Sequence, residues 1–442
     1  MSRFLATPAA WPKILTGRAE ALSADPGDLD AAVAAGAFEA LRTAVRDLGP
    51  TGTIATIASS GLRGRGGAGF PTADKWRAAA AAATDQRYVV ANGYAADPSV
   101  HTDTALLASD PWGVIEGLVI AAIAVGATRA ILAVRGDDAA LVTLLEGAVG
   151  ATIEAGFAGP DVLGSGRSVE LSVRPLRGAY MLGEETVLLK ALEGKRGQPE
   201  QRPPYPTERG LFDKPTVVNG VQTLAAVPWI IRNGAAGFAA IGSPSAPGTI
   251  LVGLRGPAGG GVAEVPVGTP LRELVKLAGG SGKRPLKALL VGGTTGGLLP
   301  ADALDTPYEF TALRAAGAHV GSGSVVIADD RACIVDLARL LTRFAADSAC
   351  GKTIPCRIGL RRLSEIGDRM ASGLAKPTDG TLLEDLAHDI AASALCDHER
   401  MATLAFTSGM RYFRSELDDH LLRSSCPAGV CQPVGMAAGA AH

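Results

Sequence analysis

Short apolar runs alternate with helical segments over the first half of the chain, and this pattern constrains the fold more than any other feature. Strand-like runs lie at residues 88–91 and 168–173, and the apolar run over 112–134 is predicted to be a helix that leads into a strand. Strands that alternate with helices form parallel sheets covered by helices. We therefore expect an α/β domain with a parallel sheet up to residue 235 or so.

The most apolar part of this run, from Gly117 to Val134, does not suit a membrane-spanning helix. It contains Gly126 and Arg129, whereas a spanning helix needs roughly 20 apolar residues. The start of the chain shows no charged leader followed by an apolar core, so we expect no secretory signal. With a formal net charge of −2, no electrostatic reason favours nucleic acid as a partner. We expect a cytoplasmic protein without direct membrane insertion, held at the inner face of a membrane only through partner subunits.

The second half of the chain has a different character. Residues 240–325 contain short strand-like runs and one short helix, which predicts a small mixed domain. Beyond residue 327 the helical period dominates, over 333–344, 360–370, 382–393 and 401–417, which predicts a helix bundle. Five of the six cysteines follow residue 349. In a cytosolic protein such clustering favours metal or iron–sulfur ligation over disulfides.

A glycine-rich segment, GLRGRGGAGFPT, occupies residues 61–72. Its glycines allow close approach of the backbone to an anion, and the two arginines between them add positive charge, so the segment can hold a phosphate. A glycine-rich loop alone fits an ordinary tight turn equally well. The residues concerned are Arg63, Gly64, Arg65, Gly66, Gly67 and Gly69.

The longer string GLRGRGGAGFPTADKW resembles the 51-kDa flavoprotein (the F subunit) of NADH:quinone oxidoreductase and its relatives in NAD-linked hydrogenases and formate dehydrogenases. The resemblance continues in order through GAYMLGEETVLLKALEGKRGQPEQRPPYP, KPTVVNGVQTL, LDTPYEFTALRAAGAHVGSGSVVI and CGKTIPCRIG. It implies a Rossmann-like FMN domain with a parallel sheet, a small β-grasp-like (SLBB) domain and a C-terminal four-helix bundle with a [4Fe-4S] cluster. The implied parts are an N-terminal helical segment (1–49), an FMN/NADH-binding α/β domain (50–238), the SLBB domain (239–326), the iron–sulfur bundle (327–420) and a cysteine-containing tail (421–442).

The same resemblance assigns residues to the flavin and to NADH. Glu184 and Glu185 take the catalytic positions beside the flavin, where a carboxylate can tune its potential. Phe70 and Tyr205, with Glu185, are the residues expected at NADH, where the two aromatic rings sandwich the adenine; filling of an aromatic core is the alternative for both. The flavin-contacting positions are Gly64, Arg65, Gly66, Gly67, Lys75, Asn92, Tyr180, Gly183, Glu184, Glu185, Val218 and Asn219.

The sequence departs from the family where polar groups are expected. After the second strand the family has two acidic residues at the positions of Tyr94 and Ala95, while Asp97 and Asp103 keep carboxylates. Neither Tyr94 nor Ala95 offers a carboxylate acceptor to flavin or nicotinamide ribose. In VVNGVQTL the family's asparagine and glutamate are replaced by Gly220 and Gln222. We therefore expect flavin binding, with weakened NADH binding.

The cluster motif departs as well. The family has three cysteines in one short turn and a fourth farther on, whereas this chain has Cys350, Cys356 and the distal Cys396, with Thr353 in place of the middle ligand. A hydroxyl is a harder and normally neutral donor than the thiolates that iron–sulfur clusters prefer. Three cysteines can hold a [3Fe-4S] cluster, or a [4Fe-4S] cluster with a non-protein ligand, or they can be residual.

A second constellation has the spacing of a zinc corner. His420, Cys426 and Cys431 lie close together in HLLRSSCPAGVC, and Cys333 supplies a fourth ligand if folding brings it near. The CPAGVC segment also resembles the C-terminal part of the electron-bifurcating hydrogenase branch of the family. The alternative is a flexible tail with two free thiols.

Three functions follow from these residues. The first is an NADH-oxidising electron-entry subunit with FMN, an iron–sulfur cluster and zinc, working with a small thioredoxin-like [2Fe-2S] subunit and a larger iron–sulfur subunit. The second is a structural homologue that has lost redox activity, as Tyr94, Ala95 and Thr353 suggest. The third is a diverged flavoprotein subunit that reduces NAD or uses another donor.

Overall fold

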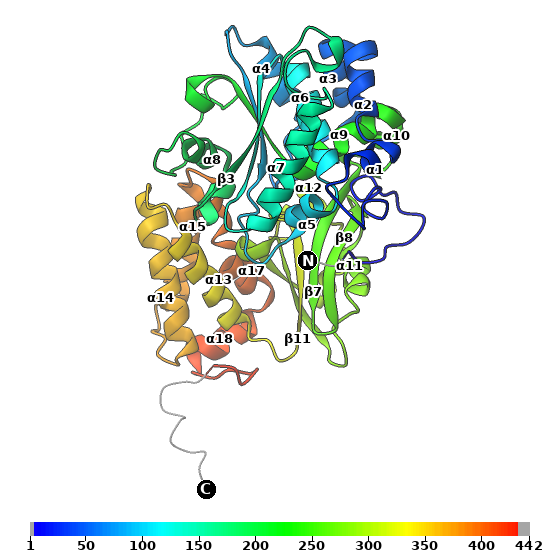
Figure 1. The fold of residues 1–442 in the computed structure, drawn as a ribbon. Coiled ribbons are helices and arrows are strands. Elements are labelled where there is room, and N and C mark those ends of the chain that lie inside the picture. Colours follow the sequence, from blue (N-terminus) through cyan, green and yellow to red (C-terminus); the bar gives the residue numbers. More distant parts are fainter. Residues whose placement is uncertain (1–3, 432–442) are drawn as a thin grey trace. The chain divides into compact units, whose positions relative to one another are not determined.

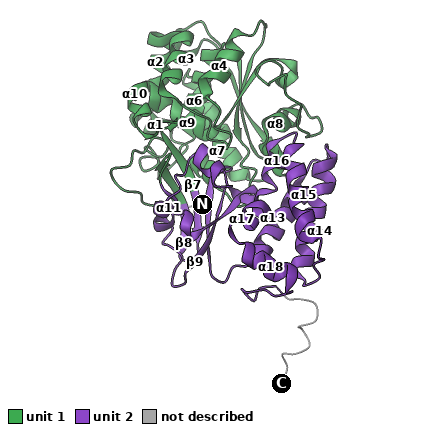
Figure 2. Cartoon of the chain, turned by 180° about the vertical axis from the view of Figure 1, so that it is seen from behind, with its two compact units in different colours: residues 1–252, 262–269 green, residues 253–261, 270–442 purple. Residues whose placement is uncertain are grey.

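The structure, a computed structural model, describes residues 4–431. The chain forms two compact units (Figure 2). Unit 1 comprises residues 1–252 and 262–269, and unit 2 comprises residues 253–261 and 270–442. The five-part division implied by the family resemblance stays a prediction. Its last part, the tail over 421–442, includes residues 432–442, which lie outside the described residues.

A four-stranded parallel sheet forms the centre of unit 1, as the sequence predicts (Figure 1). The strand order is β3-β2-β1-β4. The chain therefore adds β2 and β3 on one side of β1 and then returns to place β4 on the other side. Ligands of open α/β sheets bind at the carboxyl ends of the strands where the strand order reverses in this way. The strands are β1 Tyr88–Gly93, β2 Arg129–Arg135, β3 Glu170–Leu176 and β4 Thr216–Gly220.

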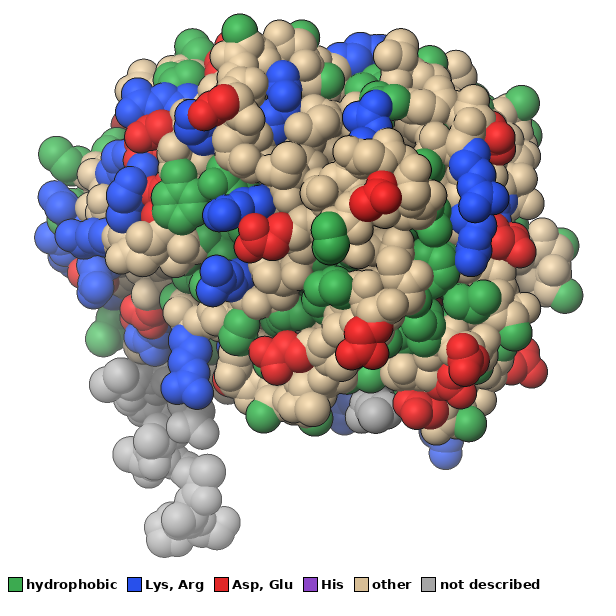
Figure 3. All heavy atoms as spheres, turned by 45° about the horizontal axis from the view of Figure 1, so that its top comes forward, with side chains coloured by type: hydrophobic (Ala, Val, Ile, Leu, Met, Phe, Trp, Pro, Cys, Tyr) green, Lys and Arg blue, Asp and Glu red, His purple; other side chains and the backbone are tan. Residues whose placement is uncertain are grey.

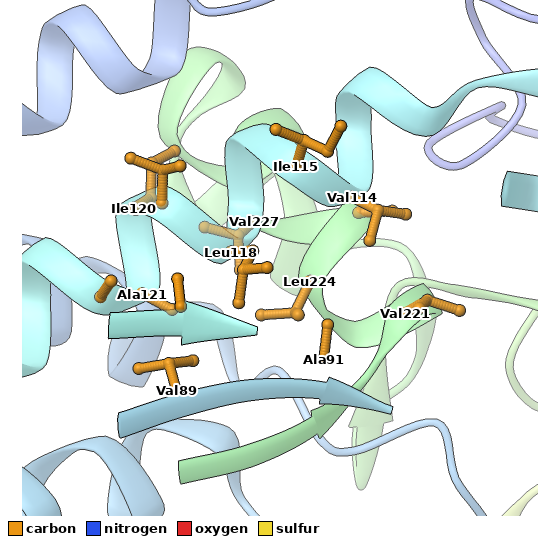
Figure 4. Packing of buried hydrophobic residues seen from close by; sticks show 14 of the residues in the cluster. Val89, Ala91, Val114, Ile115, Leu118, Ile120, Ala121, Val221, Leu224 and Val227 are labelled. Atoms are coloured by element: carbon orange, nitrogen blue, oxygen red, sulfur yellow. The ribbon is translucent and has the colours of Figure 1, made fainter. Parts of the chain in front are cut away.

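Two helices, α6 (Pro111–Val125) and α9 (Val221–Asn233), pack against this sheet. Figure 4 shows Leu118 and Leu224 from these helices beside Val89 of β1. The helices approach closely because residue 117 is glycine: a Cβ there would lie 2.0 Å from the carbonyl oxygen of Leu224. Every residue of α6 is buried, so the apolar run over 112–134 forms the predicted buried helix followed by strand β2.

Among residues 4–431, no single helix is long and apolar enough to cross a membrane. One pair meets the length and composition needed, α5 (Thr102–Ser109) with α6, but the two helices meet at an angle of 96°.

The N-terminal part of unit 1 is helical only from Leu29 onward. Residues 4–28 contain no helix, and the buried carboxylate of Glu264 accepts hydrogen bonds from the amides of Ile14 and Leu15 at 2.7 and 2.8 Å. The other helices of unit 1 are α1 Leu29–Ala34, α2 Glu39–Thr43, α3 Gly49–Ser60, α4 Thr72–Ala81, α7 Ala139–Glu154, α8 Glu185–Leu192 and α10 Ala235–Ala239.

Unit 2 combines most of a second sheet with a set of helices. The five-stranded sheet has the order β10-β9-β11-β7-β8, in which β11 pairs with β7 in parallel and with β9 in antiparallel orientation. Its strands are β7 Thr249–Gly256, β8 Gly259–Pro266, β9 Leu286–Val291, β10 Gly297–Pro300 and β11 Ser324–Asp329, and two short helices, α11 Leu271–Leu277 and α12 Phe310–Ala315, lie between them in the chain.

The C-terminal helices of unit 2 pack around a common core that includes Ile334, Leu363, Phe406 and Leu417. The helix expected over 401–417 is two helices, because the backbone leaves the helical conformation at Phe413. The helices are α13 Ile334–Ser348, α14 Leu360–Ala371, α15 Asp379–Ala392, α16 Asp397–Met401, α17 Leu404–Tyr412 and α18 Arg414–Leu422.

Charges of both signs are interspersed on the face of the molecule in Figure 3, with apolar side chains between them. This mixture agrees with the net charge of −2.

Candidate functional site

The glycine-rich segment 61–72 forms a narrow loop between α3 and α4. The amide of Gly64 donates to the carbonyl of Phe70 at 2.9 Å, which pairs the two arms of the loop. Gly67 has a φ of 100°, a left-handed conformation that favours glycine. A Cβ on Gly66 would meet no heavy atom within 4 Å. The tip of the loop is therefore open, and an anion such as a phosphate can approach its backbone closely.

The two arginines of the loop bind backbone carbonyls. Arg63 donates to the carbonyls of Ser245 at 2.6 Å and Gly69 at 2.9 Å. Arg65 is buried and donates to the carbonyl of Thr249 at 3.0 Å, and burial lowers the pKa of its guanidinium to about 10. These bonds fix the shape of the loop. Contact between Arg65 and a flavin stays a prediction, and the geometry leaves phosphate binding mainly to the backbone amides.

The predicted flavin residues gather at the carboxyl ends of β1 and β4. Asn92 and Asn219 lie near the ends of these two paired strands. The Asn92 side-chain amide donates to the carbonyl of Gly183 at 3.0 Å, which ties β1 to the single 3-10 turn Tyr180–Gly183. The indole of Trp76 in α4 donates to Asn219 Oδ1 at 2.9 Å. Four segments that are distant in sequence thus meet where the strand order reverses.

A network of four charged side chains borders this place. Lys75 Nζ lies 2.7 Å from Glu185 Oε2 and 3.3 Å from the carbonyl of Val218. Arg202 lies 3.1 Å from the other oxygen of Glu185 and also binds Glu184. The Glu184 carboxylate caps α8 by accepting two amides of its first turn at 2.8 and 2.9 Å. The two carboxylates predicted to be catalytic are therefore held in place and balanced by two cations.

The two aromatic rings assigned to NADH are on the surface. Phe70 is 51% exposed and Tyr205 is 53% exposed, so neither ring fills a core. Exposed flat rings are suited to stacking on a planar ligand. Their contact with adenine stays a prediction.

The tyrosine that replaces an acidic residue is part of the interior. Tyr94 is 1% exposed, its hydroxyl donates to the carbonyl of Gly178 at 2.7 Å, and burial raises the pKa of that hydroxyl. The guanidinium of Arg135 lies 5.3 Å from the centre of its ring. Ala95 follows with a φ of 49°. Tyr94 therefore serves packing here, and its hydroxyl is hydrogen-bonded to the backbone.

Gln222, which replaces a glutamate, bridges two polar groups. Its amide donates to Asp103 Oδ1 at 2.7 Å, and its oxygen accepts the amide of Leu251 at 2.9 Å. Burial raises the pKa of the Asp103 carboxyl. An amide satisfies both neighbours, whereas a glutamate would place a second carboxylate against Asp103. The other replacement, Gly220, has open space where a Cβ would lie.

The three cysteines of the predicted cluster share one neighbourhood in unit 2. Cys356 is the second residue of a short π-helical segment (Pro355–Gly359) before α14, and Cys396 is the N-cap residue of α16. Burial, followed by the charges of Glu399, Cys396 and Cys350, raises the pKa of the Cys356 thiol to about 12. The hydroxyl of Thr353 donates to Glu399. The donor set suits iron in kind, and cluster ligation by these cysteines stays a prediction.

The four residues of the predicted zinc site do come together. One ligand atom from each of Cys333, His420, Cys426 and Cys431 lies within 4.8 Å of all the others. Cys333 Sγ is 3.5 Å from His420 Nε2 and 3.7 Å from Cys431 Sγ. A tetrahedral zinc ion with ordinary bond lengths separates two sulfurs by about 3.8 Å and a sulfur and a nitrogen by about 3.5 Å. The distances thus fit a zinc ion, and these cysteines do not belong to a loose tail.

Hydrogen bonds prepare the same four residues for a metal. His420 Nδ1 lies 2.8 Å from the carbonyl of Glu416, so donation to that carbonyl leaves Nε2 free to face the sulfurs. Burial raises the pKa of the Cys333 thiol and raises that of Cys431 to about 11. Burial acts in the same direction on Cys426, but hydrogen bonds from the amides of Cys431 and Val430 outweigh it and help to lower its pKa to about 7.

Two residues near these sites were missed in the sequence. Arg202 neutralises the predicted catalytic carboxylates, and no local pattern indicates it. Glu399 contacts Thr353, and its position three residues after Cys396 in a helical segment is a signal that could have been used.

Two family models match the chain. Residues 57–229 match the Nuo51 FMN-binding domain, and residues 336–420 match the iron–sulfur binding region of NADH-ubiquinone oxidoreductase-F. The first match contains the open loop and the ends of β1 and β4. The second contains Cys350, Cys356, Cys396 and His420.

Relatives match over nearly the whole chain. The NADP-reducing hydrogenase subunit HndC of Solidesulfovibrio fructosivorans is 38% identical over 92% of this chain and 83% of its own length. The NADH-quinone oxidoreductase F 2 subunit of Rhizobium meliloti is 37% identical over 89% of this chain and 94% of its own length. A solved NAD+-reducing [NiFe]-hydrogenase in the H2-reduced state superimposes with a TM-score of 0.80 and 33% identity, over 87% of this chain and 65% of the solved chain.

Proposed function

The chain belongs to the family of NADH-quinone oxidoreductase F subunits and related hydrogenase subunits, and on that premise we propose that it is an NADH-oxidising electron-entry subunit of a multi-subunit oxidoreductase. One observation supports this most. The loop with open space at Gly66 lies beside the start of α9, where the Arg65 amide donates to Thr223 at 3.0 Å, and the Lys75–Glu185 pair contacts Val218 of β4, where the strand order reverses. When bound, FMN supplies an acceptor for the electron pair of NADH that can release the electrons one at a time.

The residues of unit 1 have distinct tasks in this proposal. The backbone of the loop around Gly66 binds the phosphate, because the space beside Gly66 is open, whereas the Gly64 amide is already paired with Phe70. Lys75 and Glu185 hold opposite charges 2.7 Å apart beside the flavin ring, so the local charge is fixed before the ligand arrives. Asn92, Tyr180, Gly183, Val218 and Asn219 line the remaining sides. Phe70 and Tyr205 offer exposed rings to the adenine of NADH.

Tyr94 and Ala95 favour an alternative in which NADH is not the electron donor. Tyr94 is 1% exposed and donates its hydroxyl hydrogen to the carbonyl of Gly178, and Ala95 has no polar side chain, so neither offers a carboxylate to a ribose hydroxyl. A lost hydrogen bond to a charged group weakens binding by roughly 1.5–3 kcal/mol. Two alternatives therefore stand beside the main proposal: a flavoprotein subunit that reduces NAD or uses another donor, and a structural homologue that has lost redox activity.

Unit 2 carries the onward electron path in the proposal. Cys350, Cys356 and Cys396 would hold an iron–sulfur cluster, a group that would supply single-electron chemistry between the flavin and other subunits. The expected partners are a small thioredoxin-like [2Fe-2S] subunit and a larger iron–sulfur subunit. The relatives named above are subunits of such oxidoreductases by name.

We also propose that zinc binds Cys333, His420, Cys426 and Cys431. The four ligand atoms lie at the separations of a zinc tetrahedron, and the set of three thiols and one imidazole is typical of a structural site. Such an ion joins the start of α13 to α18 and the segment that follows it.

The test is the composition and activity of the purified chain. FMN released on denaturation, together with iron, sulfide and zinc bound to the protein, supports the proposal, as does NADH-dependent reduction of ferricyanide. A colourless protein that takes up no added FMN refutes it. Bound FMN without NADH oxidation favours the alternative donor.

A further inference from the structure

Glu399 is a buried carboxylate that no residue role assigned so far uses. Its side chain lies in α16 and is 1% exposed. One carboxylate oxygen accepts the amide of Leu395 at 2.5 Å, and the other accepts the hydroxyl of Thr353. Among residues 4–431, no lysine, arginine or histidine forms an ion pair with it.

This environment is unfavourable for the carboxylate by itself. Removing a charged carboxylate from water is expensive, and buried charges are normally paired with an opposite charge or bound to a metal. One amide and one hydroxyl replace only part of the lost hydration. A positively charged group in contact with the carboxylate would therefore stabilise it.

The place of the carboxylate indicates which group. Thr353 stands where the family motif has its middle cysteine ligand, between Cys350 and Cys356. The carboxylate oxygen that contacts the Thr353 hydroxyl is therefore close to the iron that a cysteine at position 353 would bind. Cys396, the distal cysteine, is the N-cap of the helix that carries Glu399. The carboxylate therefore belongs to the same small space as all three cysteines.

The anchoring of the two oxygens suits a ligand. The amide of Leu395 fixes one oxygen, and the other is directed at Thr353. A carboxylate also supplies the negative charge that a neutral hydroxyl lacks, and it is an accepted iron ligand, although harder than a thiolate.

We propose that Glu399 is the fourth protein ligand of a [4Fe-4S] cluster whose other ligands are Cys350, Cys356 and Cys396, with the Thr353 hydroxyl orienting the carboxylate. The inference rests on the iron–sulfur centre of the proposed function. It replaces the three-iron cluster and the non-protein ligand, the two cluster types that the sequence left open.

The experiment compares metal content after anaerobic reconstitution of the full chain with iron and sulfide. The variants are Glu399→Ala, the nearly isosteric Glu399→Gln and Asp397→Asn, a matched control in the same short helix whose carboxylate is 64% exposed. Iron and acid-labile sulfide are measured per bound FMN, and EPR spectra are taken in the oxidised and reduced states. We expect four irons in the unmodified chain and in Asp397→Asn, and a loss of one iron with a three-iron EPR signal in both Glu399 variants.

A rescue variant separates ligation from a structural role. A thiolate at position 353 makes the carboxylate dispensable, so the double variant Thr353→Cys with Glu399→Ala should regain the fourth iron. A merely structural role of Glu399 predicts no such rescue.

Three results would overturn the inference. A Glu399→Gln protein with four irons and an unchanged EPR spectrum shows that the carboxylate is not a ligand. A cluster that forms only after Thr353→Cys shows that Glu399 cannot serve in its place. Absence of iron from both the unmodified chain and Thr353→Cys, with FMN bound, refutes the iron–sulfur part of the proposed function as well, whereas the flavin part stands.

Discussion

Substitution of Gly66 by alanine separates flavin binding from folding. A Cβ at this position meets no heavy atom within 4 Å, so the variant should fold with little cost. If the FMN phosphate lies against the loop, the added methyl group occupies part of its space, and we expect at least tenfold weaker binding, about 1.4 kcal/mol. Gly147→Ala is the matched control, because a Cβ there is equally unobstructed but lies on the exposed side of α7, away from the loop.

The size of the effect can be worked out for a thermal unfolding assay. FMN at about 100 times its dissociation constant stabilises the protein by about 2.7 kcal/mol, and a tenfold weaker variant at the same concentration gains only about 1.4 kcal/mol. With roughly 2–4 °C per kcal/mol for a domain of this size, the FMN-induced shift falls from about 5–11 °C to about half.

All four tryptophans lie in unit 1, so their fluorescence reports the unfolding of the flavin-binding unit. Gly147→Ala should keep the full shift. An undiminished shift in Gly66→Ala would refute the assignment of the phosphate to this loop.

Three further predictions concern single side chains. Gln222→Glu sets a second carboxylate against Asp103, whose pKa burial already raises. The loss of about 1–3 kcal/mol in urea unfolding should be complete near pH 8, should shrink as the pH falls, and should be nearly absent below about pH 4, where the same carboxyl groups are protonated in the unfolded chain as well. A loss that does not depend on pH would contradict this reasoning. His420→Ala, or a chelator, should remove zinc and destabilise α18. Because the Cys426 thiolate forms above its pKa of about 7, the amount of bound zinc should fall as the pH drops below that value. Full zinc content in His420→Ala would disprove the site. Ala95→Glu should lower the KM for NADH roughly ten- to a hundred-fold, and Ala95→Gln should lower it less. An unchanged KM in both variants would mean that the loop binds NADH in another way.

The sequence predicted the layers of this protein better than its side-chain contacts. Alternating strands and helices indicate a parallel sheet, and helical periods indicate the C-terminal helices, because both signals are local. The break at Phe413 was not predicted, since the apolar pattern runs on through the two helices.

The binding residues show the same division. His420, Cys426 and Cys431 are near one another in sequence. Cys333 lies 87 residues before His420 and reaches it only because α13 and α18 pack together. The guanidinium of Arg65 binds the carbonyl of Thr249, a strand end that no local pattern connects with the loop. Such contacts depend on tertiary packing, which a single sequence does not display.

The central claim, that this chain accepts electrons from NADH, is tested most directly by anaerobic titration of the FMN-loaded protein. The absorbance of the bound flavin is followed as NADH is added, and dithionite is added at the end as a control for complete reduction. The proposal predicts that NADH bleaches the flavin, with about one NADH consumed per FMN once the iron–sulfur cluster is reduced or absent. Bound flavin that dithionite bleaches and NADH leaves unchanged, even in large excess, would contradict it.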